Sequence, residues 1–142
     1  LYSVSETFPV GGSKVLRQSA KDVATVIGAG VTLHEALKAH DLLAKDGIAI
    51  RVIDAYSVQP IDRAGLIAAG KATGGRLLVV EDHYAQGGLG DAVSEAVWDQ
   101  GFTVQRLAVR EIPRSGGPEE LLDRYGISAS AIAAQVVARS GK

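Results

Sequence analysis

The sequence predicts an α/β fold in which a largely parallel sheet is covered by helices on both faces. Short runs rich in Val and Ile alternate with segments of helical length, which is typical of βαβ units. Most of these runs are apolar throughout, as expected of strands that are buried on both faces. The length of 142 residues suits one domain with a core of its own.

Five segments carry the signals of strands. The first is short and mixed in character, which favours an edge strand, and the later ones are rich in apolar and β-branched residues. The predicted strands cover residues 14–17, 23–28, 48–54, 76–81 and 103–109.

Capping residues mark the predicted helices in the first half of the chain. Thr32 and Glu35 form the Ser/Thr-x-x-Glu pattern of a capping box, which opens a helix that stops at Gly47. Asp62 can cap a second helix that runs to about Thr73.

Three helices are predicted in the second half. Residues 89–100 place apolar side chains on one side of a helix. Pro118 suits the first turn of a short helix that Gly126 stops, and Ser128 can cap a last helix that runs to about Arg139.

The domain organisation predicted from the sequence is one α/β domain over residues 23–142, preceded by a linker segment over residues 1–22. The stretch 8–12 contains Pro and Gly residues typical of turns. The chain begins at Leu1 and contains no Met, so we expect this linker to come from an upstream domain.

Composition excludes several functional classes. The net charge of −1 gives no electrostatic reason to expect nucleic acid or an acidic membrane as a partner. No run of apolar residues is long enough to span a bilayer. The absence of Cys excludes disulfides and thiolate chemistry, and residues 1–10 do not form a secretory signal, so a cytoplasmic location is expected.

The first candidate site is a Gly-Ala-Gly turn between a strand and a helix. Gly28 and Gly30 lie where dinucleotide-binding folds place their phosphate loop, and Asp54 ends the next strand, where a ribose-binding acid is expected. The fingerprint requires a further glycine at the position of Leu33. The partial motif leaves a nucleotide or regulatory ligand as an alternative and favours a simple tight turn.

The second candidate site follows the predicted strand 76–81, at the end of the sheet where ligands and partners gather. Two carboxylates and an imidazole there suggest acid–base chemistry, but neighbouring strand residues point to opposite faces, and no nucleophile accompanies them. We therefore interpret this segment as a rigid loop at a domain or subunit interface. Its residues are Glu81, Asp82, His83, Tyr84, Gly87, Gly88 and Gly90.

The third candidate is a weak anion site before the short helix that Pro118 opens. Arg114, Ser115 and Gly116 lie near the exposed N–H groups of the first turn. Glu119 and Glu120 already complement the helix dipole there and would repel a phosphate. A structural role in starting the helix is therefore favoured.

Four motifs in a fixed order give the chain a resemblance to one family. They lie in residues 26–37, in 50–62, in 79–90 and in 113–127. In this order they resemble the C-terminal domain of transketolases, above all of the shorter, animal-like type. The resemblance covers residues 8–138.

The resemblance implies an enzyme that transfers two-carbon ketol units between ketose and aldose phosphates in the pentose phosphate pathway. It also implies thiamine diphosphate and a divalent cation, usually Mg²⁺, in a homodimer whose active site lies between two upstream domains. The third domain of the family has a sheet of about five strands, mostly parallel and with one antiparallel strand, flanked by helices.

The family's cofactor motif is missing from this chain. That motif is Gly-Asp-Gly followed by an Asn, and the sequence contains neither. No catalytic, cofactor-binding or metal residue is therefore assigned here, and the chain alone is expected to be inactive. Its expected partners are the upstream thiamine-diphosphate-binding domains and a second copy of itself.

Three other functions stay open at this point. The chain could be the C-terminal domain of a 1-deoxyxylulose-5-phosphate synthase or of a 2-oxoacid dehydrogenase β subunit. It could also be a free-standing module that binds a nucleotide or regulatory ligand at residues 28–32. The Glu-Asp-His-Tyr and Pro-Arg-Ser-Gly segments favour transketolase.

Overall fold

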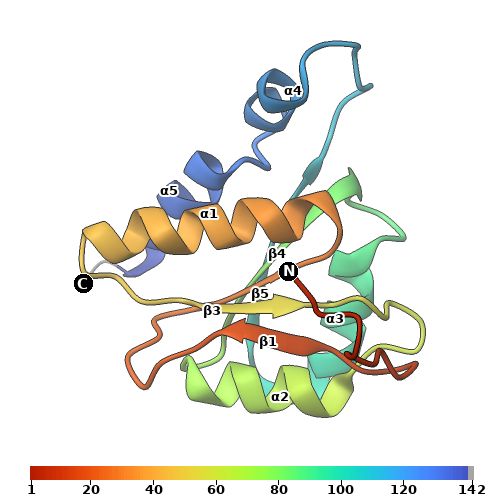
Figure 1. Ribbon diagram of the computed structural model, residues 1–142, viewed down its shortest axis with the longest axis vertical. Helices are drawn as coiled ribbons and strands as arrows, with labels where there is room; N and C mark the ends of the chain where they lie inside the picture. The colour runs from red at the N-terminus through yellow and green to blue at the C-terminus, as the bar shows by residue number, and fades with distance from the viewer. Residues whose placement is uncertain (141–142) are drawn as a thin grey trace.

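The fold is built on one mixed sheet of five strands. A computed structural model describes residues 1–140 of the chain (Figure 1). The strand order is β1-β3-β2-β4-β5, with β1 antiparallel to β3 and all other neighbours parallel. The strands are β1 (Lys14–Arg17), β2 (Thr25–Gly28), β3 (Arg51–Asp54), β4 (Arg76–Tyr84) and β5 (Thr103–Val109). The predicted fold class, including the antiparallel edge strand, is confirmed.

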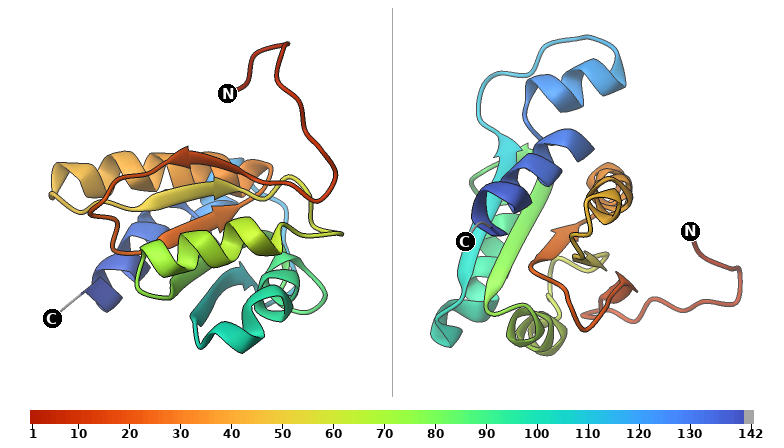
Figure 2. Two further views of the ribbon diagram at one scale, coloured as in Figure 1. Left: turned by 90° about the horizontal axis from the view of Figure 1, so that it is seen from below. Right: turned by 90° about the vertical axis from the view of Figure 1, so that its left-hand side faces the viewer.

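Helices cover both faces of this sheet and make three layers, as Figures 1 and 2 show. Helices α1 (Val31–Lys45) and α5 (Ala129–Ser140) pack on one face, and α2 (Arg63–Ala72) and α3 (Leu89–Val97) on the other.

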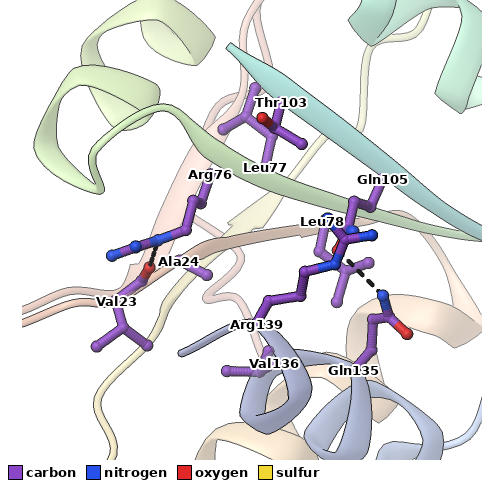
Figure 3. Close-up of a pocket in the computed structure, with 10 residues that line it drawn as sticks. All are labelled: Val23, Ala24, Arg76, Leu77, Leu78, Thr103, Gln105, Gln135, Val136 and Arg139. Atoms are coloured by element: carbon purple, nitrogen blue, oxygen red, sulfur yellow. Dashed lines mark hydrogen bonds between the residues drawn. The ribbon is translucent and has the colours of Figure 1, made fainter. Parts of the chain in front are cut away.

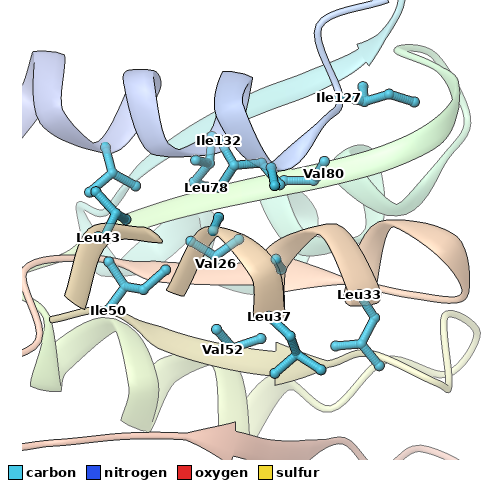
Figure 4. Close-up of a cluster of buried hydrophobic side chains, with 14 of the residues drawn as sticks. Val26, Leu33, Leu37, Leu43, Ile50, Val52, Leu78, Val80, Ile127 and Ile132 are labelled. Carbon is cyan, nitrogen blue, oxygen red and sulfur yellow. The ribbon is translucent and has the colours of Figure 1, made fainter. Parts of the chain in front are cut away.

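Alternation along the central strands divides the core into two clusters. Val26 and Val52 point toward α1 and α5 (Figure 4), while their chain neighbours Ile27 and Ile53 point toward α2 and α3. All four side chains are fully buried, and each such burial stabilises the fold by about 1.5 to 3 kcal/mol. Continuous apolar strands therefore fill both faces, which is why they carry no alternating pattern.

Two strands begin later than predicted. Regular strand pairing starts at Thr25 in β2 and at Arg51 in β3. The residues before these positions are connected only by isolated backbone hydrogen bonds, such as the one from Val23 N–H to Ala49 O at 2.9 Å. The apolar pattern continues across these residues, so it cannot mark where the ladder begins.

Two of the predicted helix caps are confirmed. The Asp62 side chain accepts from Gly65 N at 2.9 Å at the start of α2. Ser128 precedes α5, and its Oγ accepts from Ala131 N at 3.4 Å. Both caps follow the ordinary rule that a short polar side chain satisfies a free N–H of the first turn.

The predicted capping box at Thr32 is wrong. Helix α1 starts at Val31 with Gly30 as its N-cap, so Thr32 lies inside the first turn. Its hydroxyl lies 2.9 Å from Ala29 O and 2.8 Å from Val80 O, and it ties the β2–α1 turn to β4.

Glu35, the other half of the predicted box, serves a different helix. It is only 5% exposed, and its Oε2 accepts from Ala129 N at 2.8 Å at the start of α5. Its Oε1 accepts from Lys38 at 2.7 Å. Glu35 therefore joins α1 to α5, a contact between segments 94 residues apart.

One helix of the last third of the chain, α4 (Pro118–Arg124), stands outside the compact layers (Figure 1). Helix α3 is followed by a 3-10 turn (Trp98–Gln100), which together fill the predicted span 89–100. Helix α4 stands beyond the sheet at the end of a long loop (Figure 1). Gly126 follows it with a positive φ of 67°, as the predicted stop requires.

The predicted linker segment contributes β1 to the sheet, and the residues before it extend away from the layers (Figure 2). A small aromatic group holds this extension: Phe8 makes edge contacts with Tyr2 and Tyr56 at centroid distances of 4.9 and 5.0 Å. The Lys14 ammonium lies 4.0 Å from the centre of the Phe8 ring.

Candidate functional site

The segment that the sequence interprets as an interface loop lies at the carboxyl end of the sheet. Strand β4 runs on to Tyr84, three residues beyond the predicted end at Glu81, with an irregular register between Val80 and Tyr84. The irregular connection between β4 and α3 therefore covers only residues 85–88, which is shorter than expected. We call residues 81–90 the carboxyl-end loop.

Glu81 is the buried centre of the carboxyl-end loop. It is 4% exposed, and its Oε1 accepts from Gly90 N at 3.1 Å. Its Oε2 has no hydrogen-bond partner among the described residues 1–140. Burial raises the pKa of this carboxyl, although N–H groups of Gly90 and Leu89 and the charges of His83 and Arg106 work in the opposite direction.

Contacts within the molecule fix the rest of the loop. Gly87 N donates to Asp91 Oδ2 at 2.6 Å, which helps hold the pKa of that carboxyl below its ordinary value. Arg106 of β5 donates to Ala85 O at 3.1 Å and to Ser94 Oγ at 2.7 Å, and it also pairs with Asp91. These polar groups thus hold the shape of the loop, with Glu81 Oε2 as the buried exception.

Gly88 and Gly90 allow the backbone to pack against Glu81. A Cβ at Gly88 would overlap Glu81 Oε2 and lie 2.9 Å from His83 Nδ1. A Cβ at Gly90 would lie 2.6 Å from Arg106 Cδ and 2.8 Å from Glu81 Oε1. Both glycines are therefore required by close packing.

The outward side chains of the loop do not converge on a reaction centre. Asp82, His83 and Tyr84 are exposed, whereas Glu81 points inward. His83 Nδ1 lies 2.8 Å from Tyr84 O, and the two rings stack edge to face. A hollow of about 290 Å³ lies beside the loop, between Thr32, Val58 and His83. The arrangement is suited to contact and offers no positioned nucleophile–base pair.

The first glycine of the Gly28–Gly30 turn is used in packing, whereas a Cβ at Gly30 would meet no atom of the described residues within 4 Å, and a hollow of about 480 Å³ borders the turn. A Cβ at Gly28 would lie 2.9 Å from Leu33 N, so this glycine lets α1 pass close to β2. Asp54, the expected ribose-binding acid, accepts from the Tyr2 hydroxyl at 2.5 Å. Burial and the bond to Asp54 raise the pKa of Tyr2. These contacts explain the pattern without a nucleotide.

The weak anion candidate lies on the exposed loop that leads to α4. Arg114 N donates to Tyr125 OH at 2.6 Å, and Ser115 and Gly116 follow it toward Pro118. Glu119 and Glu120 occupy the first turn of α4, as the sequence indicates. An anion site here stays a prediction. Helix α4 has only 7 residues, so its N-terminus by itself does not make such a site.

Sequence reasoning missed the residues that brace the site. Arg106 looks like an ordinary polar residue of a strand, and Asp91 like a helix-start acid. Their pairing joins β5 to α3 and depends on the order of strands in the sheet. No local signal contains this information.

Two classes of site are not seen among residues 1–140. No three or more His, Asp or Glu side chains of this part gather as a metal site. No helix there has the length and apolarity to cross a membrane.

The protein is therefore a mixed α/β domain, and the polar residues of its carboxyl-end loop mainly hold the backbone of that loop in place. The family model described as "Transketolase, C-terminal domain" matches residues 12–132. The chain therefore belongs to the transketolase C-terminal domain family, as the four motifs indicate.

Relatives and solved structures agree with this assignment. The chain is 54% identical to the transketolase of Mus musculus over 133 residues and 53% identical to that of Homo sapiens over 137. These alignments cover 93% and 96% of the chain but only 21% and 22% of the relatives, so the chain spans about a fifth of their length.

A structure described as "Split gene transketolase, inactive beta4 tetramer" matches with a TM-score of 0.85 and 33% identity. That match covers 96% of this chain and 44% of the other. The transketolase of Campylobacter jejuni matches with a TM-score of 0.67 at 16% identity, over 98% of this chain and 20% of that one, which shows the shared fold.

Proposed function

We propose that this chain is the non-catalytic part of a complete transketolase and supports its assembly. In this proposal the upstream domains bind thiamine diphosphate and Mg²⁺ and transfer two-carbon ketol units between sugar phosphates of the pentose phosphate pathway. Residues 1–22 form the linker and entry segment from those domains, and β1 within it adds the edge strand of the α/β domain. The complete enzyme is a cytoplasmic homodimer.

The observation that carries the proposal is the internal use of the polar groups in the carboxyl-end loop. Gly90 N donates to Glu81, Gly87 N donates to Asp91, and Arg106 donates to the carbonyl of Ala85. A catalytic acid or base must instead reach a substrate atom. The exposed row Asp82, His83 and Tyr84 is left as a rigid surface, which suits contact with a neighbouring domain or subunit.

The proposal places the thiamine diphosphate site outside this chain. Thiamine diphosphate bound through Mg²⁺ requires oxygen ligands gathered at one place. The described residues 1–140 hold no cluster of three or more acidic or His side chains, and the whole sequence has no Asn.

The solved relative supports a role in assembly. The split-gene protein is described as an inactive tetramer of its β chain, and this chain matches 44% of that chain. By analogy, we propose that the present chain associates with itself and lacks activity without the upstream domains.

Calorimetric titration of the chain with thiamine diphosphate and Mg²⁺ tests the proposal, with full-length mouse transketolase as the positive control. We expect no binding heat and no ketol transfer by the chain. Parallel titrations with NAD and ATP test the alternative of a nucleotide module. Saturable binding of any of these ligands to the chain would overturn the non-catalytic assignment.

A further inference from the structure

A second place on the molecule has the character of a binding site, and it lies at the opposite end of the sheet from the carboxyl-end loop. The amino ends of β4 and β5, the residues that lead into β2 and the last turns of α5 enclose a cavity of about 220 Å³ (Figure 3). Its floor is apolar and includes Leu78 and Val136, both nearly fully buried and part of the core cluster under α5. We call it the amino-end cavity.

Two arginines stand at the rim of the amino-end cavity, Arg76 on one side and Arg139 on the other (Figure 3). Arg76 donates through Nε to Val23 O at 2.6 Å, a bond that fixes the guanidinium and leaves its terminal N–H groups available. The Arg139 guanidinium lies 2.6 Å from the side-chain amide of Gln105. Neither arginine forms an ion pair within the described part of the chain.

The chemistry of the lining is one-sided. Gln105 and Gln135 add side-chain amides, 3.1 Å apart, next to Arg139. Among the described residues that line the cavity there is no Asp or Glu to neutralise the two cations. Three arginines of the described part pair with an acid: Arg51 with Asp22, Arg63 with Asp99, and Arg106 with Asp91. What sets Arg76 and Arg139 apart is that both face the same cavity.

Ordinary structural roles account for part of each arginine, since Arg76 Nε holds the Val23 carbonyl and Arg139 serves the end of α5. A cation in the last turn of a helix offsets the partial negative charge of the helix end, and Arg139 occupies that place in α5. Arg76 comes from β4 and gains nothing from this effect. Two guanidiniums that face one cavity from different elements, over an apolar floor, need a further reason.

We propose that the amino-end cavity binds a small molecule that carries an oxyanion, a phosphate or carboxylate, on a compact apolar body. The planar fork of arginine matches the oxygens of both groups. The glutamine amides can donate to the same oxygens, and the floor of Leu78 and Val136 receives the apolar part. The site is separate from the carboxyl-end loop and does not depend on the assembly role of the chain.

The test is an NMR titration of the full chain with four probes: phenyl phosphate, benzoate, inorganic phosphate and uncharged benzyl alcohol. We expect phenyl phosphate or benzoate to shift the amide signals of residues 76–78 and the side-chain amides of Gln105 and Gln135. The better of the two aromatic anions is expected to bind at least tenfold more tightly than benzyl alcohol and than inorganic phosphate. Phenyl phosphate and benzoate together show which oxyanion the site prefers.

Three variants locate the site. We expect Arg76→Gln and Arg139→Gln each to weaken the better anion at least tenfold. Arg110→Gln removes the same charge after the carboxyl end of β5 and is expected to leave the affinity unchanged. Because Arg139 is exposed on the last turn of α5, its variant keeps the fold and decides the test if Arg76→Gln does not fold.

Three results would overturn the proposal. The first is that no anion binds at millimolar concentration. The second is that the uncharged alcohol binds as well as the anions. The third is that the Arg139→Gln and Arg110→Gln variants bind like the parent chain.

Discussion

The two ends of the sheet use their polar residues in opposite ways. At the carboxyl end, Arg106 donates to a carbonyl of the carboxyl-end loop and to a hydroxyl and a carboxylate of α3. At the amino end, Arg76 and Arg139 border an open cavity without an acidic partner in the described part of the chain. The comparison teaches that charged and polar side chains do not by themselves mark a binding site. A site needs side chains whose hydrogen-bonding groups are not already bonded within the protein.

The largest effect that sharpens this comparison is expected from Gly88→Ala. The new methyl group overlaps the carboxylate of Glu81, which is buried and cannot move aside without breaking its bond to Gly90. We expect the free energy of unfolding to fall by about 2 kcal/mol, the usual scale for overpacking. Urea denaturation measures it.

Gly117→Ala is the matched control for that variant. No atom lies within 4 Å of a Cβ at Gly117, which has an ordinary φ of −65°. A change below about 0.5 kcal/mol is expected, as for surface substitutions. Equal destabilisation by the two variants would contradict a tightly packed carboxyl-end loop.

A smaller effect is expected from pH, through Glu81. Because burial raises its pKa in the folded chain above the ordinary 4.5, the folded state holds this proton more tightly than the unfolded state does. The stability that the group contributes is therefore full below about pH 4.5 and is lost as pH rises through the folded-state pKa. Glu81→Gln removes this loss, so its stability relative to the parent chain should increase with pH across that window.

The pH profiles of the parent chain, Glu81→Gln and Glu95→Gln test this prediction by urea denaturation. Glu95 is exposed on α3, so its variant should keep the profile of the parent. The difference between profiles is the quantity to compare, because Asp91, whose pKa is lowered, changes stability in the opposite direction. Parallel profiles for the parent and Glu81→Gln would show that Glu81 is not buried as described.

Local signals were sufficient for most of the fold. The apolar runs located all five strands, and Asp62 and Ser128 marked two helix starts correctly, because a cap depends only on residues nearby in sequence. The same local rule failed at Thr32 and Glu35. Both side chains bond to partners distant in the chain: Thr32 to Val80 and Glu35 to Ala129. The two residues match the capping-box pattern in sequence, but their side chains serve these tertiary contacts and do not cap α1.

The sites were less predictable than the fold. The sequence pointed to the carboxyl-end loop and indicated that Glu81 and Asp82 do not converge, since alternation along a strand separates them. It did not indicate which of the two is buried. It gave no sign of the amino-end cavity. Arg76 begins β4 and Arg139 ends α5, and only the packing of α5 across β4 and β5 brings them to one rim.

The central claim is that the carboxyl-end loop is an assembly surface, and light scattering tests it most directly. Tyr84 is the probe, because its side chain is 46% exposed at the end of β4 and can be changed without disturbing Glu81. Trp98 is the control, an aromatic residue 75% exposed outside the loop. We predict that the parent chain and Trp98→Arg have a mass above the 14.7 kDa of one chain, and that Tyr84→Arg returns to that value. An unchanged mass for a folded Tyr84→Arg variant would contradict the account.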